Sequence, residues 1–363
     1  MTYRITADER ARFKRCRRQW DFASPHRRDL EPVTAVESTA VEGTATGSAL
    51  RTAVKDALAV YYYPGTWDWP HELTQSLVHK GVLRSLSDQG AADLLDSAVA
   101  ILDCYDSWSG ILDDFAPVRI DHDVDAMVPN RHEPGCGMST ADGEPVVYAA
   151  RVDLLAVDAA DEYWVVRHVI ADEWLDVDSL LLDEQAVAAC WAWEQDYIGM
   201  AIAGTVHNEI RLTGPLDLPT EPAPDARRQV AQHEPSGGGR SIPQHRRAGG
   251  PTPASGTRID VHTAGPVRRT RIRRSPEEIA SAGAQLADEA VDMIGDPLVY
   301  PAPAAHCRWC EFSRPCVAMT AYQEAEPLLI TGFRRHPDES ERKPRLGQAT
   351  WGFGRGAAPP RWQ

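Results

Sequence analysis

The stretch VVYAARVDLLAVDAADEYWVVRHVI, residues 146–170, indicates the class of fold that we expect for this chain. Val146–Val157 and Tyr163–Ile170 are rich in β-branched and aromatic residues, which favour strands. A short acidic connection, residues 158–162, joins them, and so short a connection is typical of antiparallel neighbours. We therefore predict a β-hairpin here and place the rest of the fold around it.

Helical and strand patterns continue on both sides of the hairpin. Before it, the sequence predicts helical regions over 48–60 and 72–108, the second with a break near Gly90. It also predicts a strand over 117–128 and a loop over 129–145. After it, the sequence predicts a long helix over 180–203, two strands over 206–213 and 268–274, and a final helix over 275–294. Ser275, Pro276 and Glu278 are typical of a helix start. This order predicts an α/β domain whose mixed sheet is flanked by helices.

Two segments lack the apolar pattern of a packed domain. Residues 214–257 are rich in Pro, Gly, Ser and Arg, and we expect a disordered insert there. Residues 331–363 show no sustained apolar pattern, and we expect a flexible C-terminal tail. The folded domain is therefore predicted over 1–213 and 258–330.

The net charge of −15 at first argues against a nucleic-acid partner, because proteins that bind nucleic acids usually carry a basic surplus. The charge is unevenly distributed, however. Residues 1–30 carry 9 Lys or Arg against 4 Asp or Glu, and residues 227–274 carry 11 against 2. Residues 31–226 carry 9 against 35. An acidic body with two arginine-rich segments suggests a polyanionic partner, although arginine-rich loops can also be simply solvated.

The chain shows no sign of a membrane or export signal. No run approaches the 18 apolar residues of a membrane-spanning helix, and residues 1–20 lack the apolar core of a secretory signal. We therefore expect a cytoplasmic protein without a membrane partner.

The chain has seven cysteines, and this odd number argues against a framework of disulfides. Cys104 and Cys190 lie among the apolar residues of expected helices, where a cysteine is usually an inert part of the core. Cys136 lies in the glycine-rich loop, and we assign it no role.

The other four cysteines have the spacing of metal ligands. Three of them form a C-x2-C-x5-C pattern within HCRWCEFSRPC, residues 306–316: Cys307, Cys310 and Cys316. A two-residue gap lets both thiols of a turn face one metal, and three ligands require a fourth. Cys16, within FKRCRRQW at 13–20, is the natural candidate. Four thiolates suit either zinc or an iron–sulfur cluster, and the spacing leaves both open.

A single N-terminal cysteine in a basic, aromatic stretch, together with a C-terminal C-x2-C-x5-C, resembles the RecB-type PD-(D/E)xK nucleases that carry an iron–sulfur cluster. That family includes AddB-like and CRISPR-adaptation exonuclease-like proteins. Trp20, Phe312 and the proline-containing run 301–303 also match, and the resemblance covers about residues 4–320. It implies a nuclease-like mixed sheet whose N- and C-terminal segments are joined by a [4Fe–4S] cluster. The implied cluster ligands are Cys16, Cys307, Cys310 and Cys316.

The resemblance also implies catalytic residues, and the chain matches two of them. Asp153 matches the family's Asp on the second strand, and Gln185 matches its Gln on the long helix. Arg51 stands where the family has a His, while Arg167 and Val169 replace the carboxylate and the Lys of the third strand. Mg²⁺ or Mn²⁺ catalysis uses two carboxylates at the scissile phosphate and a Lys beside the water.

No lysine lies between residues 81 and 342, so the sheet carries no catalytic Lys. Several residues elsewhere could replace the missing groups: Asp121, Asp172 or Glu173 as a second carboxylate, and Lys55 or Arg167 as the positive charge. Alternatively, Arg51, Arg151 and Arg167 would attract a phosphate directly, without a metal. A further alternative is a structural ion pair between Asp153 and Arg167.

These patterns predict a DNA-binding iron–sulfur protein of the RecB-like fold, active in DNA repair, recombination or processing, with nuclease activity weak or lost. The alternatives are an active metal-dependent single-stranded DNA exonuclease and a non-catalytic scaffold that binds proteins. The expected DNA is single-stranded or has free ends, with Trp20 and Trp309 available for stacking on bases. The expected phosphate contacts are Arg15, Arg17, Arg18, Arg51, Arg151, Arg167, Arg269 and Arg271.

Overall fold

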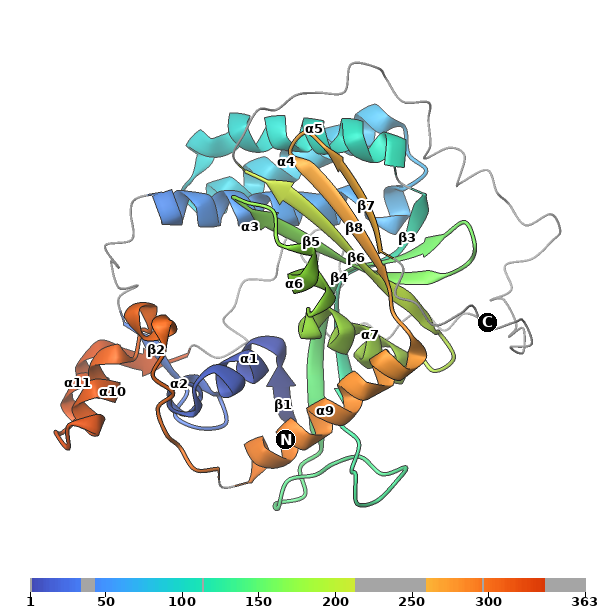
Figure 1. Ribbon diagram of the computed structural model, residues 1–363. Coiled ribbons are helices and arrows are strands. Elements are labelled where there is room, and N and C mark those ends of the chain that lie inside the picture. The colour runs from blue at the N-terminus through green and yellow to red at the C-terminus, as the bar shows by residue number, and fades with distance from the viewer. Residues whose placement is uncertain (1, 34–42, 113, 213–258, 296, 337–363) are drawn as a thin grey trace. The chain divides into compact units, whose positions relative to one another are not determined.

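The computed structural model of the protein describes residues 2–33, 43–112, 114–212, 259–295 and 297–336 (Figure 1). The chain divides into two compact units. The first comprises the described residues of 1–44, 125–150 and 283–343, and the second comprises those of 45–124 and 151–282. The insert predicted over 214–257 lies outside the described residues.

A mixed sheet forms the centre of the second unit. The strands of this seven-stranded sheet that belong wholly or partly to the second unit are β3 (Phe115–Met127), β4 (Val146–Asp158), β5 (Tyr163–Ala171), β6 (Ile202–Arg211), β7 (Ile259–Ala264) and β8 (Val267–Arg273). Strand β4 is antiparallel to β5, which confirms the predicted hairpin. Strand β5 is parallel to β6, whereas β8 is antiparallel to both β6 and β7. The predicted α/β class with a mixed sheet is therefore confirmed.

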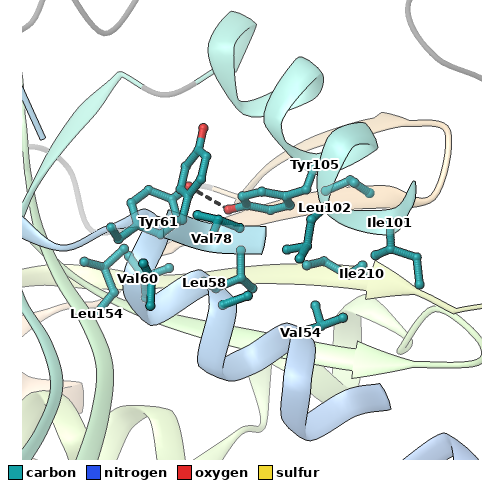
Figure 2. Close-up of a cluster of buried hydrophobic side chains, with 14 of the residues drawn as sticks. Val54, Leu58, Val60, Tyr61, Val78, Ile101, Leu102, Tyr105, Leu154 and Ile210 are labelled. Carbon is teal, nitrogen blue, oxygen red and sulfur yellow. Dashed lines mark hydrogen bonds between the residues drawn. The ribbon is translucent and has the colours of Figure 1, made fainter. Parts of the chain in front are cut away.

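Three long helices of this unit lie along one face of the sheet (Figure 1). They are α3 (Gly43–Tyr61), α4 (His71–Asp88) and α5 (Leu95–Leu112), with the short 3-10 turns η1 (Pro64–Thr66) and η2 (Ala92–Leu94) between them. Val54 and Leu58, one turn apart on α3, pack with Leu154 of β4 and Ile210 of β6 (Figure 2). Burying a Val or Leu side chain contributes about 1.5–3 kcal/mol. The helical apolar spacing of the sequence therefore identified the face that forms this core.

The helix predicted over 180–203 is two shorter helices, α6 (Val177–Leu181) and α7 (Glu184–Asp196). Asp183 separates them, because its carboxylate accepts hydrogen bonds from the backbone N–H groups of Gln185 and Ala186, each 3.1 Å. An aspartate in this position caps a new helix. Helix α7 then ends well before residue 203, and Gly199 follows with φ of +91°. Strand β7 was not predicted.

Gly204 of β6 lies where strand β8 comes closest. A Cβ atom added there would lie 2.2 Å from the backbone oxygen of Ile272 and 2.9 Å from the Cα of Arg273. Because both atoms belong to a paired strand, neither can move alone. We expect Gly204→Ala to destabilise the protein by about 3 kcal/mol or more in urea unfolding. Gly110→Ala is the matched control, since nothing lies within 4 Å of its added Cβ; equal stability of the two variants would contradict the expectation.

The first unit combines the two ends of the described chain. Its elements are β1 (Tyr3–Thr6), α1 (Ala7–Arg15), α2 (Arg17–Ala23), β2 (Leu30–Pro32), α9 (Pro276–Ile294), η3 (Ala305–Trp309), α10 (Ser313–Thr320), α11 (Glu326–Gly332) and β9 (Phe333–Arg335). Helix α9 begins in the second unit. Strand β1 pairs in parallel with the start of β4, and β2 pairs antiparallel with β9. A segment from each end of the described chain is thus joined by backbone hydrogen bonds.

Two sequence predictions concern this C-terminal part. The Oγ of Ser275 accepts a hydrogen bond from the Glu278 N–H at 3.2 Å, which confirms the predicted start of α9. The first residues of the predicted tail, 331–335, belong to α11 and β9, and residues 337–363 lie outside the described residues. Within the described ranges, no helix combines the length and apolar character needed to cross a membrane.

Candidate functional site

The four cysteines predicted as metal ligands all belong to the first unit. Cys16 lies between α1 and α2 and is 7% exposed. Burial raises the pKa of the Cys310 thiol to about 11; the Phe312 N–H lowers it, and Glu311, Cys16 and Cys316 add to the rise. The Gln19 amide donates to the Glu311 carboxylate at 3.4 Å, and Nη1 of Arg18 lies 3.7 Å from the Cys316 sulfur. The fold therefore places the segment that carries Cys16 beside the segment that carries Cys310 and Cys316.

A small apolar core holds these segments together. It consists of Phe22, Ala23, Phe312 and Leu329, with Cys310 and Cys316 packed against it. The rings of Phe22 and Phe312 lie 5.1 Å apart, so α2 is packed directly against the residues between Cys310 and Cys316. Apolar contacts therefore hold α2 against the segment that carries Cys310 and Cys316.

All seven cysteines are free thiols. The Ala304 N–H donates to the sulfur of Cys307 at 3.5 Å, and Nη1 of Arg18 lies 3.7 Å from the sulfur of Cys316. N–H donors to sulfur are typical of thiolate metal sites, so the donor set fits either zinc or a cluster. In the described ranges, no group of three or more His, Cys, Asp or Glu side chains is arranged to hold a metal ion. Metal binding would therefore require the thiols to lie closer together than they do here.

In the second unit, Asp153 of β4 forms an ion pair with a lysine that the sequence placed on the early helix. Nζ of Lys55 lies 2.8 Å from Oδ1, and the His168 N–H donates to Oδ2 at 3.0 Å. Burial alone would raise the pKa of Asp153, but Lys55 and His168 lower it below its ordinary value. Asp153 is therefore an ionised carboxylate, and the alternative of an Asp153–Arg167 pair is wrong.

Arg167 of β5 contacts Asp183 instead. Its Nη1 donates to that carboxylate, and its Nη2 donates to Oε1 of Gln185 at 3.3 Å. His207, the neighbour of Arg167 on β6, is fully buried, and neither of its ring nitrogens has a hydrogen-bond partner. Its Nδ1 is 3.9 Å from the Asp183 carboxylate, and burial lowers its pKa to about 4. His207 was not predicted as a site residue, because its burial depends on strand register.

Two of the other candidate carboxylates also contact basic side chains. Asp172 pairs with Arg51 at 2.5 Å. Arg151 contacts both Asp121 and Asp123. Glu173, the third candidate, is exposed. A divalent cation at Asp153, Asp172 or Asp121 would therefore compete with a basic side chain that already contacts the carboxylate.

The predicted phosphate contacts of β8 have other partners. Arg269 is 3% exposed, its Nε donates to Asn208 at 2.7 Å, and its guanidinium lies over the ring of Trp108. A buried arginine of this kind is structural, so its prediction as a surface phosphate contact is wrong. Arg271 is paired with Asp114 at 2.6 Å.

The arginines near Cys16 also differ from one another. Arg17 pairs with Asp292 at 3.2 Å, and Arg18 contacts Cys316. Arg15 is exposed, and in the described part of the chain it has no ion-pair partner. Trp20 is fully buried and donates to Glu9 at 3.2 Å, so it is not available for stacking as predicted. Trp309 is 77% exposed.

Neither the protein-family models nor the curated proteins that were compared contain a match to this chain. The functional argument therefore rests on the residues themselves.

Proposed function

We propose that this chain is a thiolate-metal protein on a RecB-like nuclease fold, and that it binds DNA while its nuclease activity is weak or lost. The proposed ligands are Cys16, Cys307, Cys310 and Cys316, holding a [4Fe–4S] cluster or, alternatively, zinc. The observation that carries the proposal is the contact between the segment that carries Cys16 and the segment that carries Cys310 and Cys316: Nη1 of Arg18 lies 3.7 Å from the Cys316 sulfur, and the rings of Phe22 and Phe312 lie 5.1 Å apart. The neighbouring contact from Arg18 to Cys316 spans 298 residues of sequence.

The bound group would supply a cross-link between the two terminal segments of the first unit. The residues of the chain already do part of this work, because the Phe22–Phe312 core and the β2–β9 pair hold the same segments. The metal would add the closure of a long loop, which restricts the unfolded chain more than the folded one. A structural role therefore suffices to explain the thiols.

DNA binding is proposed from the cations and the aromatic ring beside the thiols. Arg15 precedes Cys16, while Arg308 and Trp309 precede Cys310, and these two segments contact each other through Gln19 with Glu311 and Phe22 with Phe312. In the described part of the chain, Arg15 and Arg308 are exposed and without ion-pair partners. Free guanidinium groups bind phosphates, and an exposed indole stacks on an unpaired base. Single-stranded DNA or DNA ends are therefore the proposed ligand.

The loss of nuclease activity is proposed from the ion pairs of the second unit. Asp153 is bound by Lys55, and Asp172 is bound by Arg51. A phosphate-bridging metal would have to displace these cations before it could use the carboxylates. The same Lys55–Asp153 contact favours the second candidate, an active exonuclease, because it places a lysine beside the one carboxylate that the resemblance matches.

Nuclease assays with Mg²⁺ or Mn²⁺ on single- and double-stranded DNA separate the two candidates. We expect no cleavage that depends on Asp153, and we expect DNA binding that weakens steeply with salt. Asp153→Ala is compared with Asp106→Asn, a control carboxylate of α5 whose partner is His71. Cleavage that is lost in Asp153→Ala and kept in Asp106→Asn would establish the active enzyme instead. Absence of salt-dependent DNA binding would leave the protein-binding scaffold.

A further inference from the structure

Arg18 makes a set of contacts that the charge pattern of the sequence did not indicate. Its Nη1 donates to the Cys316 carbonyl at 3.2 Å and to the Thr320 hydroxyl at 2.9 Å, and it lies 3.7 Å from the Cys316 sulfur. The Thr320 hydroxyl in turn donates to the same carbonyl at 2.9 Å. One guanidinium therefore holds both the backbone and the thiol of a proposed ligand.

The backbone of Arg18 is fixed as well. Its N–H donates to the Tyr300 carbonyl at 3.1 Å, and the residue lies in the first turn of α2, two positions after Cys16. Its side chain is half-buried. Arg18 thus connects the segment that carries Cys16 to the helix that carries Cys316, through hydrogen bonds alone.

The neighbouring arginines provide a comparison within one short run. Arg15 is exposed, and no ion pair engages it in the described part of the chain. Arg17 lies over the Phe13 ring at 3.3 Å and pairs with Asp292. Of the three, only Arg18 reaches a thiol. The run therefore contains one cation free to meet a phosphate, one in an ion pair and one at the proposed metal site.

We propose that Arg18 is a positioning residue of the thiolate site, which fixes Cys316 against α2 and donates an N–H···S hydrogen bond to its sulfur. The inference rests on the proposed function, because it assumes that Cys316 is a ligand. It replaces the expected role of Arg18 as a phosphate contact. Outer contacts of this kind orient a ligand and withdraw electron density from it, and their removal typically weakens metal binding about 10–100-fold.

Cobalt binding tests the proposal, whatever metal the protein holds in the cell. Co²⁺ is titrated into the anaerobic, metal-free full-length protein, and the thiolate-to-cobalt charge-transfer absorption gives both an affinity and a band energy. We expect Arg18→Gln to weaken Co²⁺ binding about 10-fold or more. We also expect the band to move to lower energy, because the sulfur keeps more electron density once its hydrogen bond is lost.

Three further variants isolate the contact. Arg15→Gln removes a cation from the same run and is expected to leave both readouts unchanged. Arg18→Lys keeps a charged donor and is expected to recover part of the affinity and of the band position. Thr320→Val removes one hydrogen-bond acceptor of the guanidinium and leaves the arginine in place. It therefore tests the contact even if Arg18→Gln folds poorly. We expect the Co²⁺ affinity and the band energy to change in the same direction as in Arg18→Gln, but by less.

The outcomes distinguish this inference from the proposed function. If Arg18→Gln and Thr320→Val both bind Co²⁺ with the wild-type affinity and band energy, the role of Arg18 is wrong. The proposed metal site is not affected by that result. A wild-type protein that binds no Co²⁺ and is purified without iron or zinc would overturn both. Equal losses in Arg15→Gln and Arg18→Gln would also overturn the inference, because the effect would then follow charge and not the contact with Cys316.

Discussion

Replacing Cys16 with serine is expected to abolish stoichiometric metal binding by the full-length protein. Cys16 supplies the only proposed ligand from the N-terminal segment, and three remaining thiols within 307–316 leave the site without its fourth ligand. Iron and zinc analysis after anaerobic purification, together with a visible spectrum, checks this directly. An iron–sulfur cluster gives a coloured protein, whereas zinc gives a colourless one.

The same change should lower the stability of the folded protein. A metal that ties Cys16 to the C-terminal thiols closes a loop of nearly 300 residues, and by the chain-entropy estimate for cross-links such a closure is worth about 5 kcal/mol. Cys136→Ser is the matched control for an exposed thiol, and Cys104→Ser is the control for a buried one. Retention of the full metal content and spectrum in Cys16→Ser would contradict the assignment. So would an equal loss of metal in either control.

The elements that the sequence predicted are those whose apolar residues recur regularly. Val54 and Leu58 are one helical turn apart, and the hairpin of β4 and β5 has a short connection, so local pattern was enough.

The N-terminal elements were missed for a physical reason. Helix α1 buries Glu9 and Arg10 beside Phe13, and buried charges make a core helix look like a solvated one. The partner of Arg10, Glu289, lies 279 residues away in the sequence.

The candidate site also contains features that the sequence could predict and features that it could not. The four cysteines stood out in the sequence because cysteine is rare and because C-x2-C-x5-C is a typical spacing of metal ligands. The ion pairs were not found, since Lys55 meets Asp153 only after α3 has packed on the sheet. Arg167 and Arg269 look alike in sequence, yet one reaches Asp183 and the other is buried against Asn208. Which arginine stays free for a phosphate is decided by tertiary packing, and composition alone cannot predict it.

Acid is expected to destabilise the second unit as the pH falls below about 6.5. Burial lowers the pKa of His168 and of His207 to about 4, from an ordinary value of 6.5. Asp153 opposes the shift at His168, and Lys55 and Arg269 add to it. Asp183 opposes it at His207, and Arg167 and Arg274 add to it.

The direction of the effect follows from proton binding. Between pH 6.5 and about 4, the unfolded chain binds protons at these histidines and the folded chain does not, so the free energy of unfolding falls as the pH falls. Above pH 6.5 neither state binds protons at these two histidines, so they no longer change the free energy of unfolding with pH. Each histidine accounts for about 3 kcal/mol across the window. Urea unfolding followed at several pH values measures this slope.

Phenylalanine at either position removes the proton site and keeps a ring of similar size. His168 stacks on Tyr62 with ring centroids 5.6 Å apart, a contact that a phenyl ring can keep. His207 has two buried nitrogens without hydrogen-bond partners, so His207→Phe should be neutral or stabilising at pH 7. The free energy of unfolding of this variant should also fall less steeply than that of the wild type as the pH is lowered. The exposed His132, changed to Phe, is the control and should keep the wild-type slope. A wild-type protein whose stability is unchanged between pH 6.5 and about 4 would contradict the burial of these rings, and so would an unaltered slope in both variants.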